Sequence, residues 1–214
     1  MTVNMESLKT ELHCHNIFSN GHVGILEPIH DCSVTIPQQL EQAYLEGLDV
    51  LFVTNHNTID GYKQMLEYKK NYRKFDALNV YPAEEITTDN ESHVLVYGID
   101  HAIKSGLSLY EILDEAKKQN AITIAPHPFS LMDALREDSI HCDLFETFNS
   151  SNVDIYSNIK AKKFSEEKNL NVVAGSDSHV KSTIGRCTNL IHSENKLDDI
   201  IHAMRHNQLS LIHI

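Results

Sequence analysis

Two histidines stand one residue apart in the strand-like stretch TELHCH, residues 10–15. Because successive side chains of a strand point to opposite faces, His13 and His15 share one face, and Leu12 and Cys14 share the other. Two imidazoles on one face can bind one metal ion, but the same pair could instead only form hydrogen bonds. Residues elsewhere in the chain must decide between these interpretations.

Histidines and acids also follow other strand-like runs, in the stretches VTNHN, PAEEITT, APHPF, FETFN and AGSDSH. In a β/α barrel the carboxyl ends of the strands converge on one face, whereas an open sheet would spread them out. One buried histidine that satisfies a backbone carbonyl would be unremarkable, but so many at strand ends favour two or three first-row metal ions. The candidate ligands are His13, His15, His56, Glu85, His93, His127, Asp177 and His179.

The order of the predicted elements indicates the fold class. Apolar runs rich in Val, Ile and Phe alternate with amphipathic stretches of helical period, which predicts an α/β protein with parallel strands and right-handed crossovers. Its 214 residues fit one domain spanning residues 1–214. Helices are expected at 37–46, 60–72, 107–118, 153–168 and 196–206, the third capped by Ser108. Strands are expected at 10–15, 49–54, 79–84, 93–98, 121–126, 143–148, 171–176, 188–192 and 208–214.

Composition narrows the range of partners. The formal charge of −12, with only 18 Lys and Arg, argues against an extended nucleic-acid groove but allows a small phosphorylated substrate. The first residues lack a secretory apolar run, and no stretch approaches membrane-spanning length, so we expect a cytoplasmic protein without membrane contact. Four scattered cysteines suit reduced thiols. The sequence leaves the oligomeric state open.

Six stretches occur together in an order that resembles a known family: ELHCHNIFSNG, VTNHNTIDGY, AEEITT, HVLVYG, APHPF and GSDSHV. They are similar to the successive motifs of the PHP (polymerase and histidinol phosphatase) family of metal-dependent phosphoesterases, over about residues 10–186. This resemblance implies a distorted seven-stranded (β/α)7 TIM-like barrel of PHP type. It also implies two to three divalent metal ions, with Zn, Mn and Fe all suited to such ligands.

The resemblance also implies how the ligands divide. His13, His15, Glu85 and Asp177 would hold one ion, and Glu85 would bridge to a second ion held by His93 and His127. His56 and His179 would belong to a third ion, completed by Asn20. Glu84 is an alternative to Glu85 if the strand register differs.

Two residues depart from the family pattern. Asn20 and Asn55 stand where aspartates are common in the family, and an amide lacks the charge that attracts a divalent cation. The third site is therefore the one in doubt, and His22 is a fallback ligand for it.

The expected reaction is hydrolysis of a phosphate ester by a metal-activated water, with a small phosphorylated metabolite, a nucleotide or an oligonucleotide end as substrate. His13, His15, Glu85, Asp177 and His179 would act in catalysis. Arg186 and Asn149 are candidate substrate contacts, and Glu146 and Glu11 could orient ligands. Two alternatives stay open: an amidohydrolase-like C–N hydrolase, for which a bridging lysine is not apparent, and a degenerate PHP module that only binds or scaffolds.

Overall fold

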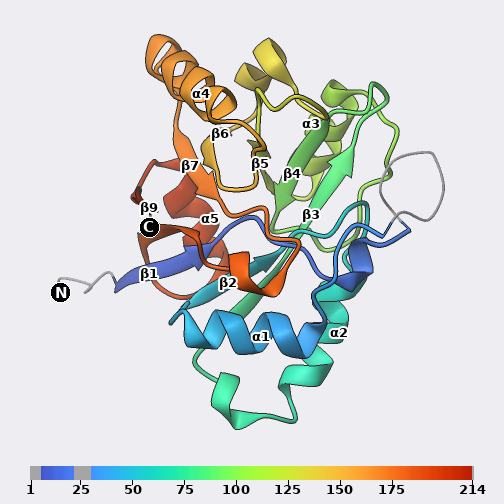
Figure 1. Ribbon diagram of the computed structural model, residues 1–214, viewed down its shortest axis with the longest axis vertical. Helices are drawn as coiled ribbons and strands as arrows, with labels where there is room; N and C mark the ends of the chain where they lie inside the picture. The colour runs from blue at the N-terminus through green and yellow to red at the C-terminus, as the bar shows by residue number, and fades with distance from the viewer. Residues whose placement is uncertain (1–5, 22–29, 214) are drawn as a thin grey trace.

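The computed structural model describes residues 6–21 and 30–213. Nine strands form one sheet that curls into a nearly closed barrel surrounded by helices (Figure 1), and their order is β7-β6-β5-β4-β3-β2-β1-β8-β9. Each strand overlaps one of the nine runs expected from the sequence. The strands are β1 (Glu6–Glu11), β2 (Val50–Val53), β3 (Asn79–Thr87), β4 (His93–Tyr97), β5 (Ile122–Ala125), β6 (Leu144–Asn149), β7 (Val172–Gly175), β8 (Cys187–Ser193) and β9 (Leu209–His213).

Two expectations about the sheet were wrong. It contains nine strands rather than seven, because β8 pairs with β1 and β9 pairs with β8. It is also mixed rather than parallel, since β4 runs antiparallel to β3 and β5, and β8 runs antiparallel to β1 and β9. The turn between β3 and β4 closes with a 2.8 Å hydrogen bond from Thr88 N to Ser92 O, and so short a link makes a hairpin, not a crossover.

The segments that follow β7 and β1 meet and close the barrel. Asp177 N donates to His13 O at 2.7 Å, and His15 N donates to Ser178 O at 3.0 Å. Within the strands, the side chain of Asn189 on β8 accepts a hydrogen bond from Ala174 N and donates one to Ala174 O. These two bonds join β8 to β7 without a backbone ladder. This closure brings the His13–His15 and Asp177–His179 segments side by side.

In the described part of the chain, five α-helices connect the strands, close to the ranges expected from the sequence: α1 (Ile36–Leu45), α2 (Asp60–Lys69), α3 (Leu109–Lys118), α4 (Ile155–Lys168) and α5 (Leu197–Arg205). Ser108 caps α3 as predicted, because its hydroxyl accepts from Glu111 N while the Glu111 carboxylate accepts from Ser108 N. Short 3-10 helices are η1 (Ile17–Ser19), η2 (Arg73–Phe75), η3 (Arg136–His141) and η4 (Lys181–Thr183). Only η4 lies between β7 and β8.

Apolar side chains fill the barrel below the strand ends. Leu12, Phe52, Tyr97 and Ile124 belong to one buried cluster, and the Tyr97 hydroxyl donates to Leu12 O at 2.6 Å. The strand ends above this core are thus held rigidly. Within the described part of the chain, no helix is long and apolar enough to cross a membrane.

Candidate metal centre

The Glu85 carboxylate lies at the centre of five imidazoles. Its Oε2 atom is 3.1 Å from His15 Nε2, 3.3 Å from His13 Nε2 and 3.5 Å from His56 Nδ1. Its Oε1 atom is 3.0 Å from His127 Nε2 and 3.1 Å from His93 Nδ1. Strand β3 directs Glu85 into the barrel mouth and leaves it 1% exposed. One buried carboxylate therefore faces histidines from three different strand ends, two of them after β1, and from one strand start.

Asp177 joins this cluster from the loop after β7. Its Oδ1 atom lies 3.4 Å from both His13 Nε2 and His15 Nε2. His13, His15, Glu85 and Asp177 offer ligand atoms that all lie within 4.8 Å of one another, as do those of His56, Glu85 and His93. The first of these groups is the set that the resemblance implies for the first ion.

A third group contains a residue that sequence reasoning missed. Asp31 Oδ2 lies 3.1 Å from His179 Nε2 and 3.7 Å from His56 Nε2, and together with His15 these residues offer ligand atoms within 4.8 Å. No strand or spacing pattern in the sequence marks Asp31, which lies in the loop before α1. A carboxylate is therefore available for the third group despite the neutral Asn20.

The expectation that Asn20 is a ligand is corrected by its hydrogen bonds. Asn20 Oδ1 accepts from Asp31 N at 2.7 Å and from Cys32 N at 2.9 Å, and Asn20 Nδ2 donates to Cys32 O at 3.0 Å. Because the loop backbone uses both ends of the amide, Asn20 places Asp31 and does not itself face the histidines. The fallback ligand His22 lies outside the described residues.

Asn55 has a structural role as well. Its Oδ1 atom accepts from Asn16 N at 2.9 Å and from the Ser19 hydroxyl at 3.1 Å. Ser19 in turn lies 3.0 Å from His15 Nδ1, so its hydroxyl fixes the ring that presents Nε2 to Glu85. An amide at position 55 thus organises the loop after β1.

A buried second carboxylate, Glu146, supports the cluster from β6. Glu146 Oε1 lies 3.1 Å from His13 Nδ1, and Glu146 Oε2 accepts from His127 N at 2.6 Å and from Asn149 Nδ2 at 2.8 Å. Glu146 thereby fixes the ring of His13 and the backbone of His127. Glu11 supports the backbone around the cluster, where it accepts from His13 N and Gly185 N.

Glu84 and Glu85 point to opposite faces of β3. Glu84 Oε2 accepts from Ile103 N at 2.9 Å, away from the histidines. Burial raises the pKa of Glu84 to about 7. The register alternative in which Glu84 replaces Glu85 is therefore wrong.

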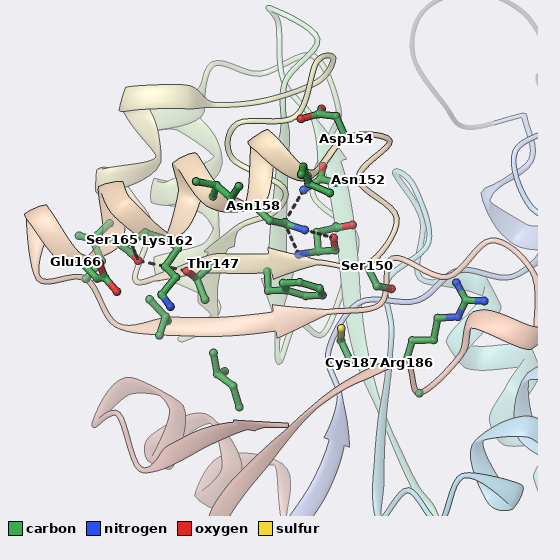
Figure 2. A pocket seen from close by; sticks show the side chains of 18 of the residues that line it. Thr147, Ser150, Asn152, Asp154, Asn158, Lys162, Ser165, Glu166, Arg186 and Cys187 are labelled. Atoms are coloured by element: carbon green, nitrogen blue, oxygen red, sulfur yellow. Dashed lines mark hydrogen bonds between the residues drawn. The ribbon is translucent and has the colours of Figure 1, made fainter. Parts of the chain in front are cut away.

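The two expected substrate contacts lie differently from the ligands. Asn149 is 1% exposed, and its amide donates to Glu146 Oε2 and Asp177 Oδ2, so the expectation that it binds substrate is replaced by a supporting role. Arg186 is exposed and lines a groove beside α4 (Figure 2). Among the described residues, no carboxylate lies within 4.0 Å of its guanidinium.

Two of the clustered residues adopt a backbone conformation that side chains rarely tolerate. His127 has φ +28° and Asp177 has φ +51°. Such strain persists only where surrounding interactions hold it, as Glu146 does for His127 N, and it concentrates at functional sites.

Charge around the cluster favours anionic carboxylates and at least one neutral imidazole. Burial alone would raise the pKa of Glu85, but His13, His56 and His93 outweigh it and hold this pKa well below its usual range. The pKa of Asp177 is likewise held low, against burial, by His13 and His15. Burial lowers the pKa of His56 to about 3, which leaves the neutral ring that can donate a lone pair to a cation.

The donor atoms fit divalent metal ions. Several buried atoms of the cluster have no hydrogen-bond partner within the described structure, namely His15 Nε2, Asp31 Oδ2, His56 Nδ1, His93 Nδ1 and His127 Nδ1. A buried polar atom without a partner costs roughly 1–3 kcal/mol. His15 Nε2, His56 Nδ1 and His93 Nδ1 all face Glu85. Cations between these nitrogens and the carboxylate would satisfy them, and imidazole with carboxylate suits Zn²⁺, Mn²⁺ and Fe²⁺.

Comparison with known proteins identifies the family. An uncharacterized protein, MJ1587 of Methanocaldococcus jannaschii, is 33% identical over 166 residues, which cover 75% of this chain and 93% of the relative. A family model described as PHP-associated matches residues 156–209. The chain belongs to the PHP family. A second uncharacterized protein of the same organism, MJ0417, is 27% identical over 188 residues, covering 83% of this chain and 68% of the relative.

Solved structures show the same fold for this PHP protein. PsfC from Pseudomonas syringae superposes with a TM-score of 0.69 at 19% identity, covering 98% of this chain and 93% of PsfC. Endonuclease Q, in complex with a 27-mer duplex that carries an abasic lesion, superposes with a TM-score of 0.68 at 16% identity. This chain covers 56% of the length of Endonuclease Q, and 93% of this chain is matched.

Proposed function

We propose that this PHP protein is a metal-dependent phosphoesterase that hydrolyses the phosphate ester of a small phosphorylated metabolite, a nucleotide or an oligonucleotide end. The observation that carries the proposal is the buried Glu85 carboxylate, with five imidazole nitrogens within 3.5 Å of its two oxygens. A carboxylate in this position can be shared between two cations, which is the arrangement used for in-line phosphoryl transfer to water.

The geometry supports a division of ligands among the ions. His13, His15, Asp177 and Glu85 would hold the first ion, and His93, His127 and Glu85 the second. His56, His179 and Asp31 would hold the third, with Asp31 in place of Asn20. When bound, such ions supply positive charge for phosphoryl oxygens and lower the pKa of water.

The chain's own residues position these groups. Glu146 fixes the His13 ring, and Asn149 occupies Asp177 Oδ2 so that Oδ1 faces the histidines. His179 is the most accessible of the clustered histidines, with 29% of its side chain exposed, so it marks the mouth through which substrate would enter. A phosphate ester approaching from this side would meet His179 and Asp31 before the buried Glu85.

A nucleic-acid substrate stays within the proposal. The expectation that the protein lacks an extended nucleic-acid groove is not supported, because Endonuclease Q shares the fold and its structure contains a DNA duplex. The formal charge of −12 favours attack at an end, where few phosphates need to be neutralised.

A substrate screen tests the proposal. Metal-depleted protein would be reloaded with Mn²⁺, Zn²⁺, Fe²⁺ or Mg²⁺ and incubated with phosphomonoesters, nucleoside bisphosphates and oligonucleotides phosphorylated at either end. We expect metal-dependent release of phosphate or of a terminal nucleotide, and its loss in Asp177→Asn. Hydrolysis of amides without phosphate release would favour a C–N hydrolase, and metal binding without turnover of either class would favour a binding module. If Arg186 contacts a second phosphate, Arg186→Ala should reduce bisphosphate turnover more than monophosphate turnover.

A further inference from the structure

Helix α4 packs Phe164 against Phe129 and Phe145, but it exposes three other large apolar side chains and buries small ones. Ser157, Ala161 and Ser165 form its buried side. Ile155, Tyr156 and Ile159 are 70%, 75% and 57% exposed. A surface helix of a monomer normally has the opposite arrangement, with its apolar stripe against the core. The outer side of α4 therefore has the composition of a covered surface.

A groove of about 1240 Å³ runs along the same helix (Figure 2). Between β7 and β8 the chain forms only the short helix η4, and residues of this connection, including Ile184 and Arg186, line the groove. One wall is the α4 stripe that contains Ile155, Ile159, Lys162 and Glu166, at the spacing of one helix face. The opposite surface includes the apolar residues Phe148, Leu170, Val172, Ile184 and Leu211. The groove thus combines the outward face of α4 with apolar residues from neighbouring strands and loops.

Two charges on this helix face have no ion-pair partner among the described residues. Lys160 pairs with Glu137 at 3.9 Å, and Lys163 pairs with Glu167 at 3.7 Å. Lys162 and Glu166, which both line the groove, have no ion-pair partner within 4.0 Å among the residues that the structure describes. One free cation and one free anion thus stand a single helical turn apart.

We infer that the occupant of this groove is helix α4 of a second copy of the chain, packed antiparallel across a two-fold axis. In such a pair residues from the two helices run in opposite order, so Lys162 meets the partner's Glu166, and Glu166 meets the partner's Lys162. The same arrangement carries Ile155 and Ile159 past the end of the partner's α4, towards Leu170 and Val172 in the partner's groove. An isologous contact of this kind is closed and self-complementary.

The order of charges favours a second copy over an unrelated helix. The α4 sequence reads KAKK and then SEEK, so its basic half precedes its acidic half. An antiparallel helix of the same charge order matches both halves at once, and a second copy of α4 also brings its exposed Ile155 and Ile159 to the apolar residues of the groove. This inference is independent of the proposed hydrolysis.

Sedimentation equilibrium of the full chain, with charge-swap variants, tests the inference. We expect a dimer at micromolar concentration. Lys162→Glu and Glu166→Lys should each weaken dimerisation at least about tenfold, because each places like charges opposite one another twice. The double variant Lys162→Glu/Glu166→Lys should restore the wild-type dissociation constant to within about threefold. Ile159→Ser should also weaken the dimer.

Lys163→Glu is the matched control, since it makes the same charge change on the same helix at a residue that does not line the groove. It should leave the dimer unchanged. Circular dichroism would show that each variant is folded. A wild-type protein that stays monomeric, single variants that dimerise normally, or a double variant no better than the single variants would each overturn the inference.

Discussion

The side-chain amide of Asn149 joins two carboxylates of the metal centre, donating to Asp177 Oδ2 at 3.2 Å and to Glu146 Oε2 at 2.8 Å. The backbone of Asn149 is itself held by Asn158 on α4, whose Oδ1 accepts from Asn149 N at 3.0 Å and whose Nδ2 donates to Asn149 O at 2.9 Å (Figure 2). The Asn158 side chain thereby connects helix α4, through Asn149, to the carboxylates of the metal centre.

Replacement of Asn158 should therefore weaken metal binding without a direct contact to the metals. We expect Asn158→Ala to lower the affinity for Co²⁺ about tenfold, a loss typical of a residue that orients ligands. Titration followed by the visible absorption of bound Co²⁺ measures this change. Asn152→Ala is the control, because Asn152 Nδ2 donates to Asn158 Oδ1, whereas the Asn149 backbone is held by Asn158 itself. Equal Co²⁺ affinity in wild type and Asn158→Ala would contradict the connection.

The adjacent acids of β3 should differ sharply in their effect on metal content. Glu85→Gln removes the charge that faces five imidazoles, so we expect loss of two bound ions. Glu84→Gln changes the same chemical group on the opposite face and should leave metal content unchanged. Elemental analysis of both purified variants measures the ions directly, and full metal content in Glu85→Gln would refute the shared-carboxylate assignment.

The raised pKa of Glu84 predicts that the free energy of unfolding depends on pH. Burial raises its pKa from 4.5 to about 7. Between these values the folded state keeps the Glu84 proton while the unfolded state releases it, so stability falls as pH rises and the loss is complete above about pH 7. The difference between 4.5 and about 7 corresponds to roughly 3 kcal/mol at most.

In Glu84→Gln the amide oxygen can still accept from Ile103 N and no ionisation is needed. Urea unfolding at several pH values should show that the variant gains stability relative to wild type from about pH 5 to about pH 7. Glu11, whose pKa burial also raises to about 7, is present in both proteins, so the comparison isolates Glu84. A difference that does not change with pH would contradict the raised pKa.

The third metal group should depend on Asp31 and not on a charge at position 20. Asp31→Asn removes the carboxylate that lies 3.1 Å from His179 Nε2, so the affinity for the third ion should fall. Asn20→Asp should not tighten that ion, because the new carboxylate would lose the donor to Cys32 O and could only disturb the loop. Equilibrium dialysis of both variants measures stoichiometry and affinity, and tighter binding in Asn20→Asp would restore Asn20 as a ligand.

Much of this centre could be predicted because strands fix the direction of their side chains. The two-residue period of strand-like sequence correctly placed His13 beside His15 and turned Glu85 away from the face of Glu84, and His56, His127 and Asp177 follow the carboxyl ends of β2, β5 and β7. Asp31 could not be predicted in the same way, since its position depends on hydrogen bonds from Asn20 across a loop without a periodic pattern. The antiparallel hairpin of β3 and β4 was missed although the intervening Asp-Asn turn is short.

The sequence predicts that helix α4 exists but not which of its faces is buried. Its existence follows from the sequence, but its outward apolar residues cannot be assigned to a face until the neighbouring strand is known. The inward residues Ser157 and Ala161 are small because the helix lies close against β6. A periodic pattern predicts which side of a helix is apolar, but it does not predict which element packs against that side.

Gly175 at the end of β7 should be required for the centre. A Cβ atom there would lie 1.8 Å from Glu146 Oε1 and 2.7 Å from the Cβ of His13, and neither group can move freely because both are buried and joined to each other. We expect Gly175→Ala to destabilise the fold by about 1–3 kcal/mol, as overpacking does, and to weaken metal binding by displacing His13. Thermal unfolding and Co²⁺ titration measure the two effects.

Glu146→Asp shortens the obstructing side chain by one methylene, so the double variant Gly175→Ala/Glu146→Asp should recover part of the lost stability. It should not recover the lost metal affinity, since the contact to His13 Nδ1 is gone. Normal metal affinity in Gly175→Ala would contradict this prediction. It would show that the Glu146 carboxylate still holds the His13 ring when a Cβ atom at residue 175 displaces it.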